Sequence, residues 1–217
     1  MAETLSIETT THGRVLVVRS PDGPSAGWLV AFHGYGQGAD DALADVVRIP
    51  GTDAWNVASV QALHRFYTRN DEKIVASWMT RQDREHAIAD NLAYVDRVVQ
   101  EVMGDPPGRI VFAGFSQGVA MAYRAAVIGR HAAEGVIALG GDLPPELTAA
   151  TPARRWPRVL IGAGDADTWY TEAKVRADAA ALAAMHVTCE VVRYHGGHEW
   201  TNEFRAAAGA WLRQFLA

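Results

Sequence analysis

The chain has 217 residues, of which 49% are hydrophobic and 21% charged, and these ordinary globular proportions exclude a disordered, collagen-like or disulfide-stapled protein. With 25 acidic and 20 basic residues the net charge is −5, so there is no basic surface for a phosphate backbone, and nucleic acid is not an expected partner. A chain of this length is expected to fold as one domain over residues 1–217.

The N-terminal residues carry acids and have no apolar run behind a basic start, so they do not resemble a secretory signal. The apolar stretches of the sequence are far shorter than the ~20 residues of a membrane span. We therefore expect a cytoplasmic protein without stable membrane insertion.

Two short β-rich runs, residues 4–8 and 15–19, open the chain and predict an antiparallel hairpin. After a Pro- and Gly-containing break at 21–24, short apolar runs alternate with helical patterns. Strands are expected at 28–33, 55–61, 109–114, 135–139, 158–163 and 188–194. Helices are expected at 83–103, 119–128, 171–185 and 201–215. The alternation predicts an α/β fold with a mostly parallel, twisted sheet and helices on both faces.

The most specific motif is Gly114-Phe115-Ser116-Gln117-Gly118, which lies directly between a predicted strand and a predicted helix. This is the setting of a nucleophile elbow, a sharp turn that holds a serine in a strained backbone conformation. Glycines flank the serine because larger side chains would collide with the strand or the helix. The motif predicts Ser116 as a nucleophile at the carboxyl ends of the strands.

A serine nucleophile needs a base and an acid that orients it, and both follow later predicted strands. For the base we favour His198, which follows two glycines, over His195 at the end of a strand. For the acid we favour Asp167, further into its loop, over Asp165. The order serine, aspartate, histidine is the one expected on an α/β-hydrolase sheet.

An oxyanion hole requires two donors directed at the charge that develops on the carbonyl oxygen. The backbone amide of Gln117 is one candidate, and the amide of Tyr35, in a glycine-containing loop after an early strand, is the other. His33, which begins that loop, is expected to hold it by hydrogen bonds and to take no part in the chemistry.

Other site types fit the sequence less well. Residues 34–39 match a relaxed dinucleotide-binding pattern, but Asp40 and Asp41 follow where a pyrophosphate would dock. The histidines lack the spacing of a zinc site, and Cys189 is expected to be a small buried hydrophobic residue. No cofactor and no metal are therefore expected. A non-catalytic protein that keeps the scaffold is the remaining alternative of a different class.

Taken together, these segments resemble the phospholipase/carboxylesterase family of small α/β-hydrolases, which includes the acyl-protein thioesterases. The matching segments run from about residue 28 to the C-terminus and are 33–36, 77–79, 114–118, 141–144, 164–167 and 196–199. The resemblance implies Ser116, Asp167 and His198 as the catalytic triad, with the Tyr35 and Gln117 amides as oxyanion donors.

The same resemblance places Trp78, Met79 and Leu143 beside the acyl pocket. One departure is Trp169-Tyr170, where the family commonly has Val-Pro, and we expect Trp169 to form part of the pocket wall. The short stretch between 141 and 158 leaves no room for a helical cap domain, so an open pocket is expected.

The predicted function is that of a serine carboxylesterase acting on small-molecule esters with small or medium acyl groups. Lysophospholipase or acyl-protein thioesterase activity with the same triad is the alternative. The resemblance permits a homodimer, but no motif in the sequence requires one.

Overall fold

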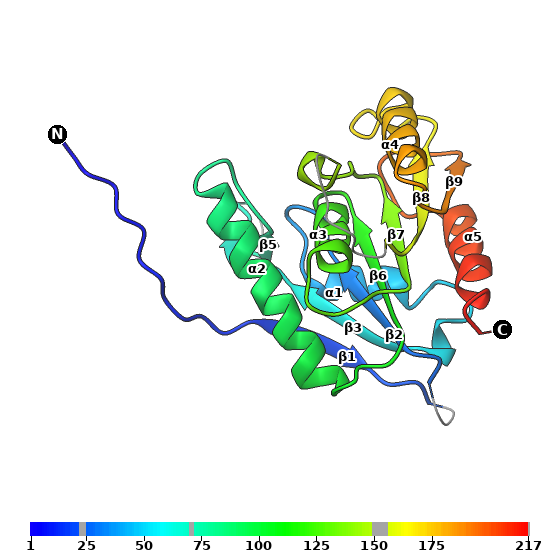
Figure 1. The fold of residues 1–217 in the computed structure, drawn as a ribbon, viewed down its shortest axis with the longest axis horizontal. Coiled ribbons are helices and arrows are strands. Elements are labelled where there is room, and N and C mark those ends of the chain that lie inside the picture. The colour runs from blue at the N-terminus through cyan, green and yellow to red at the C-terminus, as the bar shows by residue number, and fades with distance from the viewer. Residues whose placement is uncertain (22–24, 70–71, 149–155, 217) are drawn as a thin grey trace.

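The structure is a computed structural model that describes residues 1–21, 25–69, 72–148 and 156–216. Its centre is a seven-stranded sheet with the strand order β1-β3-β2-β6-β7-β8-β9 (Figure 1). The strands are β1 (Arg14–Val18), β2 (Trp28–Phe32), β3 (Asn56–Gln61), β6 (Ile110–Phe115), β7 (Gly135–Leu139), β8 (Arg158–Gly164) and β9 (Cys189–Tyr194). All neighbouring pairs are parallel except β1 with β3, so the fold is the predicted α/β fold with a mostly parallel sheet.

Helices cover both faces of this sheet, as predicted (Figure 1). Those of one face are α2 (Arg84–Val98), α3 (Gln117–Val127) and α4 (Glu172–Ala184), and those of the other are α1 (Ala39–Val46) and α5 (Asn202–Arg213). Short helical turns lie at Thr52–Ala54 and Pro145–Leu147, and a π-helical turn, Val99–Met103, extends α2. Parallel strands joined by helices bring the carboxyl ends of the strands to one edge.

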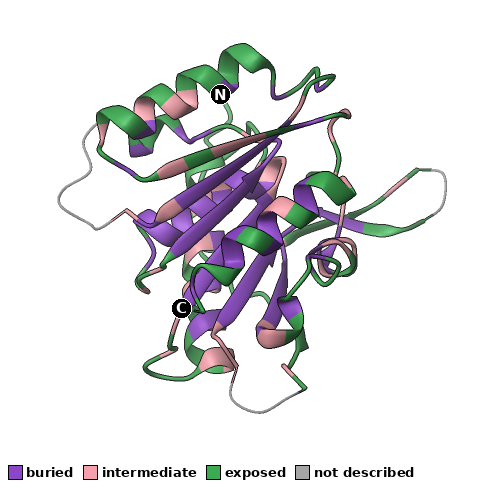
Figure 2. Ribbon diagram, turned by 90° about the vertical axis from the view of Figure 1, so that its right-hand side faces the viewer, coloured by how far each residue is buried: buried purple, intermediate pink, exposed green. Residues whose placement is uncertain are grey.

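Burial on both faces explains why the central strands are continuous apolar runs. In β2, Val30 and Phe32 pack on the side of α3, whereas Leu29 and Ala31 pack on the side of α5. Figure 2 shows the central strands buried and the outer faces of the helices exposed. The alternation therefore divides the hydrophobic core into two layers, one on each side of the sheet.

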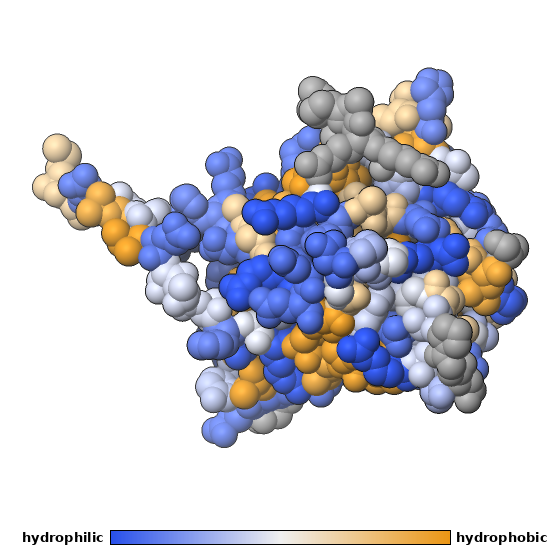
Figure 3. Space-filling model, turned by 60° about the horizontal axis from the view of Figure 1, so that its bottom comes forward, coloured by the Kyte–Doolittle hydropathy of each residue, from blue (hydrophilic) through white to orange (hydrophobic). Residues whose placement is uncertain are grey.

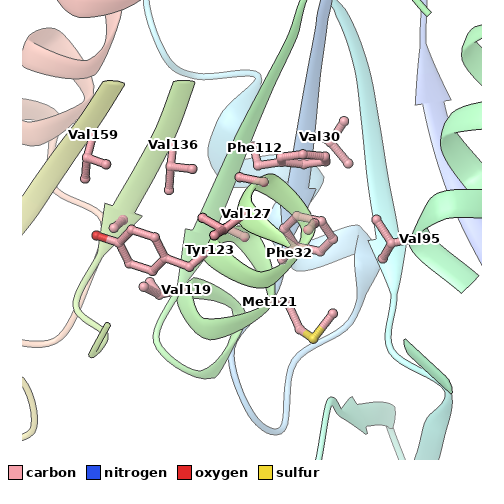
Figure 4. Packing of buried hydrophobic residues seen from close by; sticks show 14 of the residues in the cluster. Val30, Phe32, Val95, Phe112, Val119, Met121, Tyr123, Val127, Val136 and Val159 are labelled. Carbon is pink, nitrogen blue, oxygen red and sulfur yellow. The ribbon is translucent and has the colours of Figure 1, made fainter. Parts of the chain in front are cut away.

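The packing of α3 against the sheet fixes the position of the turn that precedes this helix. Val119, Tyr123 and Val127 of α3 lie over Phe112 of β6 and Val136 of β7 (Figure 4). All five side chains are at most 1% exposed, and burial of each contributes about 1.5–3 kcal/mol. The helix is therefore held firmly against the strand that leads into it.

The predicted N-terminal hairpin is wrong. Residues 1–13 form no strand, and the segment before His12 extends away from the body of the molecule, with Leu5 and Ile7 exposed (Figures 1 and 3). The second predicted run does form β1, but its antiparallel partner is β3, with Arg14 opposite Gln61. A run of β-forming residues becomes a strand only where it can pair with the edge of another strand. For β1 this edge is that of β3, which lies far along the sequence.

The structure contains a different hairpin, which the sequence did not predict. Its strands, β4 (His64–Tyr67) and β5 (Ile74–Ser77), pair antiparallel beside the main sheet. A bridge between Gln37 and Ala76 connects the hairpin to the loop after β2. This contact holds the loop that was predicted to supply an oxyanion donor.

Between β7 and β8, the described part of the connection contains the short turn Pro145–Leu147, and residues 149–155 of the stretch that was expected to lack a cap lie outside the described residues. None of the described helices is both long and apolar enough to cross a membrane.

Candidate active site

Ser116 lies on a strained turn between β6 and α3. Its φ of 52° and ψ of −119° form a conformation that non-glycine residues rarely adopt and that costs about 1–3 kcal/mol. The turn is held on both sides, because the Ser116 amide donates to the Leu139 carbonyl at 2.9 Å and the Val119 amide donates to the Ser116 carbonyl at 3.0 Å. Such strain at a single serine is typical of a functional position.

The flanking glycines are required by close backbone contacts. A Cβ at Gly114 would lie 2.5 Å from the Gly118 carbonyl oxygen. A Cβ at Gly118 would lie 2.3 Å from the carbonyl oxygen of Phe32. Both distances are shorter than real contacts allow, so the sequence pattern around Ser116 has the steric cause that was expected.

His198 and Asp167 form a hydrogen-bonded pair near this serine. His198 Nδ1 lies 2.7 Å from Asp167 Oδ2, and the Asp167 side chain is fully shielded from solvent. The other carboxylate oxygen accepts the amides of Trp169 at 2.7 Å and Tyr170 at 2.9 Å. Burial opposes ionisation, but the hydrogen bonds from His198 and the two amides outweigh it and hold the pKa of Asp167 below its usual value. An ionised Asp167 fixes the Nδ1–H tautomer of His198 and leaves Nε2 as an acceptor.

The alternative base and acid, His195 and Asp165, pair with each other and do not line the pocket that contains Ser116. His195 Nδ1 lies 2.7 Å from Asp165 Oδ2, and the His195 side chain is 93% exposed. Asp165 also accepts the Gly196 amide at 3.1 Å, and this hydrogen bond, together with the one to His195, lowers the pKa of Asp165. The hydrogen bond to Asp165 and its negative charge raise the pKa of His195. The structure thus separates an exposed pair from a buried one.

Ser116 and His198 line the same pocket, which has a volume of about 310 Å³. The imidazole of His198 packs on the Phe115 ring at 5.0 Å between centroids, and a Cβ at Gly140 would lie 3.1 Å from it. No hydrogen bond joins the Ser116 hydroxyl to His198 among the described residues. Hydrogen bonds between a nucleophile and its base are often long in the absence of substrate, so this geometry is compatible with the predicted roles of the two residues.

The loop after β2 lies beside the serine. A Cβ at Gly34 would be 3.4 Å from Ser116 Cβ. Within the described chain, the amides of Tyr35 and Gln117 donate to no acceptor, so both are available to a substrate oxygen. The Tyr35 ring points elsewhere and contacts Phe66 at 5.6 Å between centroids.

His33 has the structural role that was expected of it. It is fully buried, its Nε2 accepts the Ala62 amide at 3.0 Å, and its Nδ1 donates to the Gly34 carbonyl at 2.7 Å. Burial lowers the pKa of His33, which keeps the ring neutral. Both ring nitrogens are therefore used in holding the loop.

Three of the four expected pocket residues line the pocket, namely Met79, Leu143 and Trp169. Trp78 does not: it is fully buried, its indole N–H donates to the His33 carbonyl at 2.8 Å, and its ring packs edge-on against Phe32. The expectation that Trp78 contacts the acyl group is therefore corrected. An amphipathic ring with a satisfied N–H is stable beneath the loop, and the sequence did not distinguish that position from the pocket wall.

Two polar side chains that the sequence analysis missed hold the pocket together. The Gln117 carboxamide accepts the Trp78 amide at 2.8 Å and donates to the Met79 carbonyl at 3.0 Å. Asp178 accepts both the Leu143 amide and the Tyr170 hydroxyl at 2.9 Å, and burial raises its pKa. Asp178 lies in α4, far along the sequence from Leu143. Only its position as an acid on the inward face of that helix could have indicated its role.

Across the described residues, no three His, Cys, Asp or Glu side chains lie close enough together to hold a metal ion. Burial raises the pKa of Cys189 to about 11, so its thiol stays protonated.

Comparison with known proteins identifies the family of this chain. The family model described as phospholipase/carboxylesterase matches residues 14–215. A search of curated proteins finds no match.

Among solved structures, esterase PE8 is similar with a TM-score of 0.75 and 20% identity, covering 94% of this chain and 100% of that one. The Bacillus cereus carboxylesterase has a TM-score of 0.73 and 18% identity, with 94% of both chains covered. The Zea mays acyl-protein thioesterase 2 has a TM-score of 0.69 and 20% identity, with 95% of this chain and 100% of that one covered. At these identities the likeness shows a shared fold.

Proposed function

The chain belongs to the phospholipase/carboxylesterase family, and from this we propose that it is a serine carboxylesterase that hydrolyses esters of small or medium acyl groups through an acyl-enzyme on Ser116. The observation that carries the proposal is the strained Ser116 in one pocket with His198, whose imidazole is hydrogen-bonded to the buried Asp167. This combination of nucleophile, base and orienting acid is the one that acyl transfer requires.

In the acylation step, His198 Nε2 takes the proton of the Ser116 hydroxyl as the oxygen attacks the ester carbonyl carbon. The free amides of Tyr35 and Gln117 donate to the oxyanion that forms. Asp167 keeps the imidazole in the required tautomer and stabilises its positive charge. The C–O bond to the alcohol then breaks, and the alcohol leaves with the proton that His198 returns.

In the second step, water attacks the acyl carbon while His198 Nε2 accepts a water proton. The bond to Ser116 breaks, the carboxylic acid leaves, and the serine recovers its proton. The same two amides stabilise the second oxyanion, so one set of donors serves both steps.

The pocket supports a small or medium acyl group. Its volume of about 310 Å³ lies at the low end of the ~300–1,000 Å³ that ligand pockets span. The same residues would attack a thioester or a lysophospholipid. A long acyl chain, however, has little space in a pocket of this volume. We therefore place simple carboxylic esters first among substrates.

The test is the hydrolysis of a short chromogenic ester by Ser116→Ala. We expect kcat to fall by at least about 10³-fold with an unchanged thermal unfolding midpoint. A variant that keeps a tenth of the wild-type rate would contradict the proposal.

The matched control compares two histidines of the same loop. His198→Ala is expected to be nearly as damaging as Ser116→Ala, whereas His195→Ala, in the exposed pair, should be mild. Rates across acyl lengths, with a thioester and an amide included, then rank the substrate classes.

A further inference from the structure

The lining of the pocket includes charged groups that the proposed chemistry does not use. Besides the apolar residues, the pocket is lined by Arg84, Arg124, Lys174 and Asp142. Arg84, Lys174 and Asp142 are exposed to solvent, whereas the Arg124 side chain is 1% exposed. A buried charge beside a purely hydrocarbon acyl chain would cost free energy, so Arg124 in particular requires a separate explanation.

Arg124 extends into the pocket from the same helix that follows the nucleophile. Ser116, Ala120 and Arg124 are spaced by four residues and all three line the pocket, so they share one face of α3. At 1.5 Å per residue, the Arg124 backbone lies about 12 Å along the helix from Ser116, and helical side chains lean back toward the N-terminus. Arg124 therefore stands at the end of the pocket, opposite the reacting serine.

The Arg124 guanidinium is only partly satisfied. Its side chain is 1% exposed, and Nη2 and Nε donate to Glu146 Oε1 at 2.6 and 2.8 Å. Among the described residues, Nη1 has only the Met79 sulfur, at 3.9 Å, as an acceptor. A thioether is a weak acceptor, so a buried cationic N–H group facing the pocket lacks a strong partner.

Arg84 adds a second positive charge to the pocket lining, and among the described residues it has no ion-pair partner of its own. Lys174 pairs with Asp142 at 3.1 Å and Arg124 pairs with Glu146, but among the described residues Arg84 forms no ion pair or hydrogen bond. Burial opposes ionisation of Glu146, but its hydrogen bonds and the charges of Arg124 and Arg84 hold its pKa below the usual value, so this one carboxylate is ionised beside two arginines of the pocket lining. This end of the pocket thus has an excess positive charge in a chain whose net charge is −5.

We propose that the ester substrate carries a carboxylate at the far end of its acyl group, and that Arg84 together with Nη1 of Arg124 binds this carboxylate. The inference rests on the proposed function and names its substrate class, the monoesters of short dicarboxylic acids. The apolar residues Met79, Leu143 and Trp169 contact the methylene groups between the two ends. Arginine suits the far end because its planar group binds carboxylates through two parallel hydrogen bonds.

The reaction balances with water as the co-reactant. Ser116 Oγ bonds to the ester carbonyl carbon, the bond to the alcohol oxygen breaks, and the alcohol leaves with the serine proton. Water then cleaves the acyl–serine bond, which releases the dicarboxylate and returns the proton to Ser116. The distal carboxylate is unchanged throughout.

The experiment compares kcat/KM for monomethyl succinate, glutarate and adipate with that for the uncharged methyl butanoate, pentanoate and hexanoate, by release of methanol. We expect at least one monoester to exceed its uncharged counterpart by tenfold or more. In Arg84→Gln this ratio should fall to near one. In the control Arg81→Gln, an exposed arginine outside the pocket lining, the ratio should stay at the wild-type value. The preference should also shrink at 1 M salt, where screening acts within ~3 Å.

The outcomes separate this inference from the proposed function. Ser116-dependent hydrolysis of the uncharged esters without a preference for any monoester would overturn the inference and leave the proposed function intact. An equal loss of preference in Arg81→Gln would also overturn it, because the effect would then be that of net charge. If no ester is hydrolysed faster by the wild type than by Ser116→Ala, the proposed function itself fails.

Discussion

The replacement of Asp167 by Asn isolates the role of a single proton. Oδ1 of Asp167 accepts the amides of Trp169 and Tyr170, and Oδ2 faces His198 Nδ1 at 2.7 Å. An asparagine oxygen still accepts both amides, and its NH₂ group then faces the imidazole. His198 must present Nδ1 as an acceptor and carry its proton on Nε2, where it cannot act as a base toward Ser116.

The expected loss is about 10⁴-fold in kcat, the effect of a reversed tautomer in a triad of this type. At ~1.36 kcal/mol for each factor of ten, this is about 5.5 kcal/mol of transition-state stabilisation. The assay is the steady-state hydrolysis of a short chromogenic ester, with circular dichroism to verify the fold.

The chain provides a matched control in its second Asp–His pair. Asp165→Asn makes the same chemical change beside His195, whose side chain is 93% exposed, and kcat should stay within about twofold of wild type. Equal losses in the two variants, or a loss below tenfold in Asp167→Asn, would refute the assignment of the buried pair as the catalytic one.

The pH dependence of stability follows from the same carboxylate. Its pKa in the folded protein is lowered, against ~3.9 when unfolded, so the ionised group stabilises the fold above the unfolded pKa. That contribution is lost as the pH falls through the lower folded pKa. Urea unfolding of wild type and Asp167→Asn should therefore give a difference in free energy that is largest above about pH 4 and shrinks below it; a difference that grows on acidification would contradict the lowered pKa.

Substitutions of Trp169, Trp78 and Gly118 give further tests, measured by urea unfolding and by the dependence of kcat/KM on acyl length. Trp169→Ala should change the free energy of unfolding by less than about 0.5 kcal/mol, since Trp169 is 74% exposed, and should lower kcat/KM for the longer acyl groups. Trp78→Ala should cost about 3–5 kcal/mol of stability, because this ring is fully buried; an unchanged stability would place it at the surface. Gly118→Ala should cost about 1–3 kcal/mol or more, because its Cβ would meet the Phe32 carbonyl oxygen at 2.3 Å, whereas Gly197→Ala, with its nearest contact at 4.0 Å, should be tolerated.

The parts of the site that could be predicted from the sequence are those with a local steric cause. The strained conformation of Ser116 and the close contacts of Gly114 and Gly118 leave a pattern within five neighbouring positions. The central strands were readable because burial on both faces produces short continuous apolar runs.

The remaining features depend on contacts between distant segments. The partner of β1 is β3, more than 40 positions away at the Arg14–Gln61 pair, and no local pattern separates that pairing from a hairpin. The position of Trp78 beneath the loop follows from its hydrogen bond to His33, which the sequence does not show. The hydrogen bonds of the Arg124 guanidinium likewise depend on a distant residue, Glu146, which lies 22 positions further along the chain.

The central claim is that Ser116 forms an acyl-enzyme, and trapping that intermediate tests it most directly. The enzyme is mixed with a short chromogenic ester, quenched in acid within the first turnovers, digested, and analysed by mass spectrometry. We expect the mass of the acyl group on the peptide that contains Ser116, in an amount equal to the burst of released chromophore. A burst with the acyl group on another residue would contradict the claim, as would hydrolysis in Ser116→Ala at the wild-type rate.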